Sequence, residues 1–349
     1  MRNLKIVAVL HKSMHHAGYS GYSQFLECIT GIKVIHPKPI IPYFLAKFIA
    51  KIIRKGLGSY DTASLYKDLQ VILYILKNYK ENILVHYLNG ERDIRLAIAL
   101  FSKKKHIKFV ATFRKPPTIL ESSIENKKYI RKLDGVITVG ANQVAFIKDW
   151  LDIKHINYIP HGVDIDFFRP NYELRTEKRI LLVGQHMRDF DIFNKVIEKC
   201  LLKNTVTKVD VVLHKAYQNK IISHNNISVH SGVTDKELRG FYQKASVLFI
   251  PLVDVTACNS ILEAMACGLP IISTAVGGNA AYFKNSKNIL LEKDSITEKY
   301  CKAIYDIMDA DASLEISNAS RQKALDYDWK RIAGEINEFY TDLNNNYKK

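Results

Sequence analysis

Residues 254–282, DVTACNSILEAMACGLPIISTAVGGNAAY, place small, polar and acidic residues around a predicted helix start. A buried strand is predicted to end at Ile250, and a helix then begins near Asn259 or Ser260, both favourable N-cap residues. The free backbone N–H groups of such a helix start form an anion site that suits a diphosphate. Glu263, about one turn later, could accept hydrogen bonds from ribose hydroxyls. The alternative is an ordinary helix followed by a strand, with Glu263 on the solvated surface.

The elements around this stretch follow an alternating order. Short apolar runs alternate with longer amphipathic stretches, which indicates parallel sheets covered by helices. In the first half of the chain the predicted strands are residues 4–10, 32–35, 83–86, 108–112, 135–139 and 157–159. In the second half they are residues 179–183, 209–213, 227–230, 247–250, 270–273 and 289–292. Both halves are therefore expected to be Rossmann-like α/β domains.

A polar stretch separates the two halves. Residues 160–178, PHGVDIDFFRPNYELRTEK, carry no apolar period and hold two prolines, which is typical of an interdomain linker. From residue 295 onward the pattern is helical only, and it predicts a closing helix whose apolar positions are Trp329, Ile332, Ile336 and Tyr340. The expected domains are an N-terminal domain over residues 1–160, a linker over 161–172, a C-terminal domain over 173–325 and a final helix over 326–349 that packs on the first domain.

Four blocks carry a resemblance to a known family. They are PHGVDIDFFRP at residues 160–170, LLVGQHMRDF at 181–190, VTDKELRGFYQKASVLFIP at 233–251 and EAMACGLP at 263–270. With these blocks the chain resembles the retaining GT-B glycosyltransferases of family four. The resemblance implies a GT-B fold, in which two Rossmann-like domains face a central cleft and a C-terminal helix crosses back to the first domain. It also implies transfer of a sugar from a nucleotide-diphosphate sugar in the C-terminal domain to an acceptor in the N-terminal domain.

The resemblance assigns the donor-binding residues. It implies that the backbone at Gly184 approaches the donor and that Arg188 holds the diphosphate, a task that suits the planar guanidinium fork. An ion pair of Arg188 with Asp189 or Asp191 is the alternative. The implied donor-binding residues are Gly184, His186, Arg188, Val233, Ala257, Cys258, Asn259, Ser260, Ile261 and Glu263. We expect UDP or GDP as the nucleotide, no cofactor and no metal, because the helix start and the basic side chains take the place of a divalent ion.

Two positions depart from the family pattern. The family usually carries two glutamates, of which Glu263 fills the second, but Val255 stands at the first and only the adjacent Asp254 offers a carboxylate. Arg114, in ATFRKPP, stands where the family often has a histidine beside the reacting sugar. Arginine stays protonated and cannot act as a base, but it could stabilise charge on the leaving phosphate. Arg114 and Arg188 are therefore the catalytic candidates of a retaining reaction in which the donor phosphate takes the acceptor proton.

The acceptor side has weaker signals. Residues 11–22, HKSMHHAGYSGY, follow the first predicted strand and hold Gly18 and Gly21. In GT-B enzymes this loop faces the cleft, although a close backbone approach without any ligand is the alternative for the two glycines. His86 and Glu91, in HYLNGE, follow a predicted strand at the edge where ligands of open α/β sheets bind. These four residues are the acceptor-side candidates.

The net charge of +16 predicts an anionic partner. Nucleic acid is not favoured, because the sequence has no zinc-finger spacing, RRM signature or basic zipper. Residues 42–56, PYFLAKFIAKIIRKG, predict a basic amphipathic helix of the kind that lies in the interface of a bilayer. Its membrane candidates are Phe44, Lys47, Phe48, Lys51, Ile52, Arg54 and Lys55, and a core helix whose lysines face water is the alternative. We expect an anionic membrane surface and a lipid-linked or saccharide acceptor as partners.

The remaining features concern location and rival functions. The five cysteines are scattered without a CxxC pair, so neither a disulfide framework nor a zinc site is indicated. The sequence starts directly in an apolar strand and has no run long enough to span a bilayer, so we expect a cytoplasmic enzyme, peripheral at the inner face of the cell membrane. Such an enzyme fits bacterial-type surface polysaccharide or glycolipid assembly. The rival functions are a sugar-nucleotide epimerase and a non-catalytic sugar-nucleotide-binding partner of another glycosyltransferase.

Overall fold

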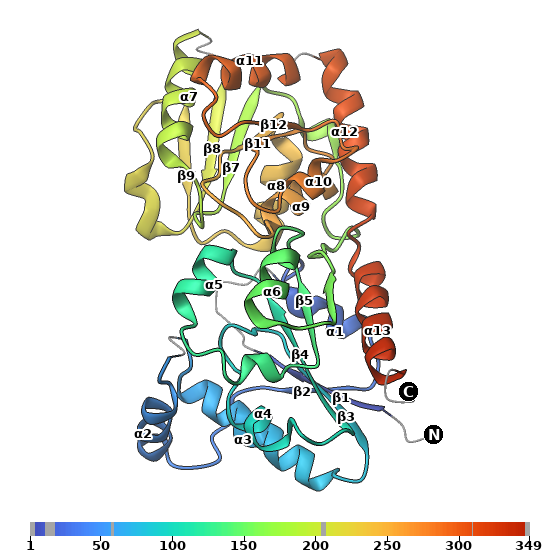
Figure 1. The fold of residues 1–349 in the computed structure, drawn as a ribbon. Helices are drawn as coiled ribbons and strands as arrows, with labels where there is room; N and C mark the ends of the chain where they lie inside the picture. The colour runs from blue at the N-terminus through green and yellow to red at the C-terminus, as the bar shows by residue number, and fades with distance from the viewer. Residues whose placement is uncertain (1–3, 11–17, 57–58, 204–206, 309, 346–349) are drawn as a thin grey trace. The chain divides into compact units, whose positions relative to one another are not determined.

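The chain divides into two compact units (Figure 1). The computed structural model describes residues 4–10, 18–56, 59–203, 207–308 and 310–345. Within these ranges, the first unit comprises residues 4–10, 22–160 and 330–345, and the second comprises residues 18–21 and 161–329. The chain therefore leaves the first unit at Pro160 and returns to it after Trp329.

The first unit is built on a six-stranded parallel sheet in the order β2-β1-β3-β4-β5-β6. The strands are β1 (Leu4–Val9), β2 (Ile32–Ile35), β3 (Asn82–Tyr87), β4 (Ile107–Phe113), β5 (Gly135–Thr138) and β6 (Ile156–Tyr158). Its helices are α1 (Phe25–Cys28), α2 (Tyr43–Ile53), α3 (Thr62–Lys77), α4 (Leu96–Phe101), α5 (Pro117–Ser123), α6 (Gln143–Leu151) and α13 (Trp329–Asn345). The central strands are buried almost throughout, as parallel strands covered on both faces must be.

The final helix α13 packs on the first unit. Its apolar positions Trp329, Ile332, Ile336 and Tyr340 are all buried, which confirms the helical period read from the sequence, and Trp329, the first of them, belongs to the second unit. A Cβ on Gly135 would lie 2.8 Å from side-chain carbons of Phe339 and Leu343, so the start of β5 lies directly beneath this helix. The C-terminal helix thus covers part of the N-terminal unit.

The second unit repeats the plan, with a parallel sheet in the order β12-β11-β10-β7-β8-β9. The strands are β7 (Arg179–Val183), β8 (Lys208–Val212), β9 (Ile227–His230), β10 (Val247–Ile250), β11 (Ile271–Thr274) and β12 (Ile289–Leu291). The helices are α7 (Phe190–Lys203), α8 (Asp235–Lys244), α9 (Asn259–Ala266), α10 (Ala280–Phe283), α11 (Thr297–Met308) and α12 (Ala310–Leu325). The predicted α/β class and all twelve predicted strands are therefore confirmed, each within one residue at either end.

The predicted start of α9 is confirmed, but the expected N-cap residue is wrong. Helix α9 begins at Asn259, but its N-cap is Cys258, without a side-chain capping bond. The expected caps are engaged elsewhere: the Asn259 amide donates to the carbonyl of Ser20, and the Ser260 hydroxyl accepts from Arg188. Long-range contacts have thus replaced local capping at this helix start.

Candidate functional site

The start of α9 lies beside a guanidinium group. Arg188 donates through Nη2 to Ser260 Oγ at 3.2 Å and contacts Cys258 Sγ at 3.6 Å. The same side chain is held by the loop after β7, because Nε and Nη2 donate to the Val183 carbonyl at 3.0 and 2.9 Å and Nη1 donates to the His186 carbonyl at 2.8 Å. Arg188 is thus positioned by neutral groups only.

Gly184 allows this guanidinium to lie close to the backbone. Its φ of +82° lies in the region that favours glycine, and a Cβ at this position would be 2.9 Å from Nη2 of Arg188. The predicted alternative, an ion pair of Arg188 with Asp189 or Asp191, does not form in the part of the chain that the structure describes. Asp189 instead accepts from the backbone N–H of Ile192 at 3.0 Å.

The α9 start therefore concentrates positive potential. Within the described ranges, the first-turn amides of Asn259 and Ser260 donate to no protein acceptor, as is usual for a helix start. A helix N-terminus next to an unpaired guanidinium attracts an anion, and two or three oxygens of a diphosphate could be bound at once. The structure brings together Gly184, Arg188, Cys258 and Ser260, all predicted from the sequence.

Glu263 lies one turn further along α9 and is 2% exposed. Its Oε1 accepts from Ser20 Oγ, and its Oε2 accepts from the Tyr242 hydroxyl at 2.7 Å. Burial raises the pKa of this carboxyl, while the two hydrogen bonds act in the opposite direction. The alternative in which Glu263 is solvated is therefore wrong. Each oxygen of the Glu263 carboxyl group accepts one hydrogen bond from a hydroxyl group.

Residues 18–21 belong to the second unit, although the chain on either side of them belongs to the first. Ser20 binds Glu263, the backbone N–H of Gly18 donates to Asp235 Oδ2 at 3.1 Å, and the Tyr19 ring stacks on Phe167 with centroids 3.6 Å apart. Gly18 and Gly21, predicted on the acceptor side, thus lie on either side of Ser20, whose hydroxyl donates to the Glu263 carboxylate. Residues 11–17 of the same predicted loop lie outside the described residues.

Val255 stands where the family has its first glutamate, and here it is part of the core. The side chain is 6% exposed, and its carbonyl accepts from the backbone N–H of Gly278 at 2.8 Å. The neighbouring Asp254, considered as a substitute, uses Oδ1 to accept from the Val255 N–H at 2.7 Å. Ala257, just before α9, and Asn259, its first residue, are half-buried, and Ile261 is fully buried. Position 255 therefore has no carboxylate that could contact a sugar.

The other two donor candidates lie at neighbouring loops. His186 is exposed in the loop after β7. Val233 is half-buried just before α8, where Thr234 and Glu237 form a capping box. Val233 also lines a groove of about 640 Å³ between the end of β9 and the outer face of α8.

In the first unit, His86 is fully buried rather than placed at the surface. Its Nδ1 lies 2.6 Å from the Tyr340 hydroxyl and its Nε2 lies 2.7 Å from Thr112 Oγ1. Burial lowers the pKa of His86 to about 3, so the ring is neutral at ordinary pH. An acceptor contact would require the ring to leave both partners. As placed, His86 ties β3 and β4 to the C-terminal helix.

Glu91 and Arg114 are joined by Asn89. With the Asn89 amide oriented to match its neighbours, its nitrogen donates to Glu91 Oε1 at 3.0 Å and its oxygen accepts from Arg114 Nη2 at 2.8 Å. Burial raises the pKa of Glu91, and the charge of Arg114 opposes that shift. The Arg114 guanidinium also lies 6.0 Å from the centre of the Tyr22 ring. The two predicted residues thus form one cluster after β3 and β4, and their roles stay predictions.

Comparison with known proteins relates the second unit to a defined family. Residues 177–310 match the family described as "Glycosyl transferases group 1". A sucrose-phosphate synthase from Thermosynechococcus elongatus superposes with a TM-score of 0.73 at 15% identity, over 98% of this chain and 99% of that one. The fold is GT-B. Anabaena HepE, solved in complex with UDP and glucose, has the same fold, with a TM-score of 0.66 at 12% identity, over 97% and 100% of the two chains.

The curated relatives found by sequence match a smaller part of this chain than the solved structures do. A D-inositol 3-phosphate glycosyltransferase from Arthrobacter sp. (strain FB24) is 24% identical, over 60% of this chain and 57% of that protein. One from Corynebacterium jeikeium (strain K411) is 21% identical, over 54% and 52%. The chain therefore spans about half the length of the curated relatives it matches. The family match thus covers residues 177–310, and the solved structures show that the chain has the GT-B fold.

Gln143 is a residue of the GT-B N-terminal unit that sequence reasoning missed. Its buried amide accepts through Oε1 from the N–H groups of Val139 and Gly140, at 3.1 and 3.0 Å. It donates through Nε2 to the carbonyls of Phe113 and Lys115, at 3.2 and 2.8 Å. Both sides of the amide are thus used, and the loop that carries Arg114 is fixed to the loop after β5. No motif marks this residue in the sequence.

Replacing Gln143 with leucine is expected to lower the free energy of unfolding by about 3 kcal/mol, because buried N–H and carbonyl groups lose their partners. Gln143→Glu is the matched variant, since a carboxylate can still accept from Val139 and Gly140 but cannot donate to the Arg114 loop. Hydrogen exchange should then rise in residues 113–115 in both variants, and in residues 139–140 only in the leucine variant. Equal protection of residues 113–115 in wild type and Gln143→Glu would contradict this positioning role.

Helix α2 confirms the predicted amphipathic helix and shows which side is covered. Ala46 and Ala50 are its buried residues, whereas Phe44, Phe48 and Ile52 are 75%, 62% and 62% exposed. These three residues are spaced by four and form one apolar stripe on the surface. The basic candidates Lys47, Lys51, Arg54 and Lys55 are also exposed. The alternative of a core helix with only lysines facing water is therefore wrong.

Across the described ranges, no group of three or more His, Cys, Asp or Glu side chains is arranged to hold a metal ion. In the same part of the chain, no helix combines the length and apolar character needed to cross a bilayer.

Proposed function

We propose that this chain is a glycosyltransferase that moves a hexose-type sugar from a UDP- or GDP-linked donor to an acceptor. The observation that carries the proposal is the unpaired Arg188 guanidinium at the start of α9, in the segment that matches the group 1 family. A UDP complex of a structure with the same fold supports the choice of donor class. The diphosphate would bind Arg188 and the amides of Asn259 and Ser260, and the ribose hydroxyls would bind Glu263.

In the proposed reaction the bond from the sugar C1 to the donor phosphate breaks and a bond from C1 to the acceptor oxygen forms. With retention, the released phosphate oxygen takes the acceptor proton, so no carboxylate base is needed, which is consistent with Val255 in the core. The α9 start and Arg188 would offset the charge of the leaving diphosphate, and this is why we propose a metal-independent enzyme.

A thermal-shift screen against UDP, GDP, ADP and TDP, alone and with their common sugars, tests the proposal. A nucleotide that binds only the folded state stabilises it by about 2.7 kcal/mol at 100 times its Kd. We expect one base to give a clear shift in wild type, and Arg188→Gln to lose most of it. A screen in which no nucleotide shifts the melting temperature would remove the donor assignment.

We further propose that the acceptor is lipid-linked and that α2 holds the enzyme at the inner face of the cell membrane, in surface polysaccharide or glycolipid assembly. The exposed stripe of Phe44, Phe48 and Ile52 beside four basic residues supports this. Aromatic and aliphatic side chains enter the lipid interface, while lysine and arginine attract anionic headgroups.

The double variant Lys51→Glu/Lys55→Glu is expected to weaken binding to vesicles containing an anionic lipid by at least about tenfold, because each basic residue near the surface contributes about 1 kcal/mol. Lys103→Glu/Lys105→Glu is the matched control, since it makes the same charge change at exposed residues away from α2. Vesicle sedimentation separates the two. Equal losses for both variants would mean that only net charge matters, and no loss for the α2 variant would remove the membrane proposal.

One observation favours a second candidate, a non-catalytic partner that binds a sugar nucleotide. Position 255 offers no carboxylate to the sugar. A protein that binds the donor in the screen, yet shows neither transfer nor slow donor hydrolysis, would support this candidate over the enzyme.

A further inference from the structure

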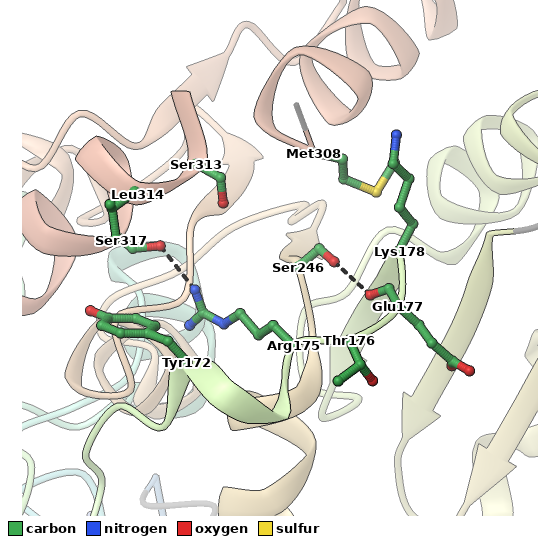
Figure 2. Close-up of a pocket in the computed structure, with 10 residues that line it drawn as sticks. All are labelled: Tyr172, Arg175, Thr176, Glu177, Lys178, Ser246, Met308, Ser313, Leu314 and Ser317. Carbon is green, nitrogen blue, oxygen red and sulfur yellow. Dashed lines mark hydrogen bonds between the residues drawn. The ribbon is translucent and has the colours of Figure 1, made fainter. Parts of the chain in front are cut away.

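The second unit contains a pocket of about 320 Å³ that is separate from the α9 start (Figure 2). Residues 172–178, which lead into β7, and Ser246, just before β10, line one side, and residues of α11 and α12 line the other. The pocket thus lies at the N-terminal edge of the parallel sheet, whereas α9 begins beyond the C-terminal end of β10. Its volume is at the lower end for ligand sites, which suits a small metabolite rather than a nucleotide sugar.

The described residues that line the pocket carry net positive charge. Among them Arg175 and Lys178 are cations, and the carboxylate of Glu177 is already paired with Arg179 at 2.6 Å. Among the described residues, the Lys178 ammonium group has no hydrogen-bond or ion-pair partner. Two cations and no unpaired carboxylate among these described lining residues favour an anionic ligand.

Arg175 is held by neutral groups, and Figure 2 shows one of these hydrogen bonds, the one to Ser317. Its Nη1 donates to Ser317 Oγ at 2.9 Å, and its Nη2 donates to the carbonyls of Cys267 and Gly268 at 3.2 and 2.8 Å. Its Nε is buried without a partner. Burial lowers the pKa of this guanidinium group. Among the described residues no carboxylate pairs with Arg175, so an incoming anion would be a charged partner for it.

The rest of the lining offers groups that recognise a sugar. The hydroxyls of Thr176 and Ser313 have no hydrogen-bond partner within the described ranges. The Tyr172 ring is 39% exposed, with the Arg175 guanidinium carbon 4.9 Å from its centre. Hydroxyl groups and one aromatic face around a polar centre are the usual means of holding a small polar ligand in a fixed orientation.

We propose that this pocket binds a monosaccharide phosphate. The phosphate would bind the Lys178 ammonium group, and the sugar would extend toward the Tyr172 ring and Arg175, with Thr176 and Ser313 as partners for its hydroxyls. The site is independent of the proposed transfer reaction, because it shares no side chain with Glu263 or Arg188 and lies at the opposite edge of the sheet.

Isothermal titration of the full chain with glucose 6-phosphate, glucose and inorganic phosphate tests the proposal. We expect saturable binding of glucose 6-phosphate that is stronger than binding of either fragment. Lys178→Gln should weaken it at least tenfold, whereas Lys195→Gln, which removes an exposed lysine of α7 outside the pocket, should leave it unchanged. Tyr172→Ala should reduce the preference for glucose 6-phosphate over inorganic phosphate.

Glu263→Ala separates this pocket from the α9 site. Binding of glucose 6-phosphate should be unchanged in that variant, even where nucleotide binding is lost. Binding that disappears in Glu263→Ala but persists in Lys178→Gln would place the sugar phosphate at α9 and overturn the proposal. So would an absence of saturable binding in wild type, or equal affinity for glucose 6-phosphate and inorganic phosphate, which would remove the saccharide part.

Discussion

Replacing Glu263 with alanine is expected to weaken binding of the nucleotide found in the thermal-shift screen by at least about 100-fold. The carboxylate is buried and accepts one hydroxyl donor on each oxygen. A hydrogen bond to a charged group contributes about 1.5–3 kcal/mol, so the loss of two acceptors for the ribose hydroxyls accounts for this factor. Titration calorimetry with wild type and Glu263→Ala measures it, and unchanged affinity would discard the ribose role.

Ser20→Ala is the matched variant, and its effect should have the opposite sign. Ser20 Oγ donates to Oε1 of Glu263. A ribose hydroxyl that donates to the same oxygen must therefore displace the Ser20 hydroxyl. Removing the competing hydroxyl is expected to tighten nucleotide binding by up to about tenfold, which corresponds to one hydrogen bond of about 1.4 kcal/mol. A weaker complex in Ser20→Ala would mean that Ser20 helps to hold the donor instead of giving way to it.

The raised pKa of Glu263 also leads us to expect that the free energy of unfolding depends on pH. Because burial raises the pKa of Glu263 in the folded state, its protonated form is favoured there. The group therefore contributes stability that is fully present below the ordinary carboxyl pKa and is lost as the pH rises through the raised folded value. Glu263→Gln should lack this loss. The difference in unfolding free energy between wild type and Glu263→Gln should then change with pH only across that window.

The sequence predicted the sheets well because their signal is local. Each strand is an apolar run bounded by polar residues, and the alternation with helices decides that the sheets are parallel. The donor-side residues Gly184, Arg188 and Ser260 could also be predicted, since one motif order places the loop after β7 and the start of α9 at neighbouring strand ends. What these residues contact there could not be read from the motif.

The remaining features depend on partners far away in the sequence. His86 looks like a ligand at a strand end, but its burial depends on Tyr340, which is 254 residues away. The Glu263 carboxyl group accepts a hydrogen bond from Ser20, 243 residues away, and no local pattern connects the two residues. Gln143 bonds to backbone groups of two loops, and backbone partners leave no trace in residue type. Prediction therefore ended where a side chain's role is set by long-range packing.

The second large effect concerns stability at Gly277, which holds the loop around Val255. Its φ is +55°, and a Cβ there would lie 1.9 Å from the Val255 carbonyl oxygen and 2.7 Å from Asp254 Oδ1. The carbonyl cannot move away cheaply, because it accepts from the Gly278 N–H at 2.8 Å. Gly277→Ala is therefore expected to lower the free energy of unfolding by about 3 kcal/mol or more, combining backbone strain with a clash against the main chain.

Gly240→Ala is the control for this change within the same unit. Gly240 lies inside α8, its φ is not positive, and no atom lies within 4 Å of a Cβ built there. Alanine should stabilise that helix by about 0.5–1 kcal/mol. Urea unfolding of both variants therefore gives shifts of opposite sign if the loop at Gly277 is as tightly packed as the Val255 contact indicates. A Gly277→Ala variant as stable as wild type would show that this loop can rearrange, and position 255 could then move relative to the start of α9.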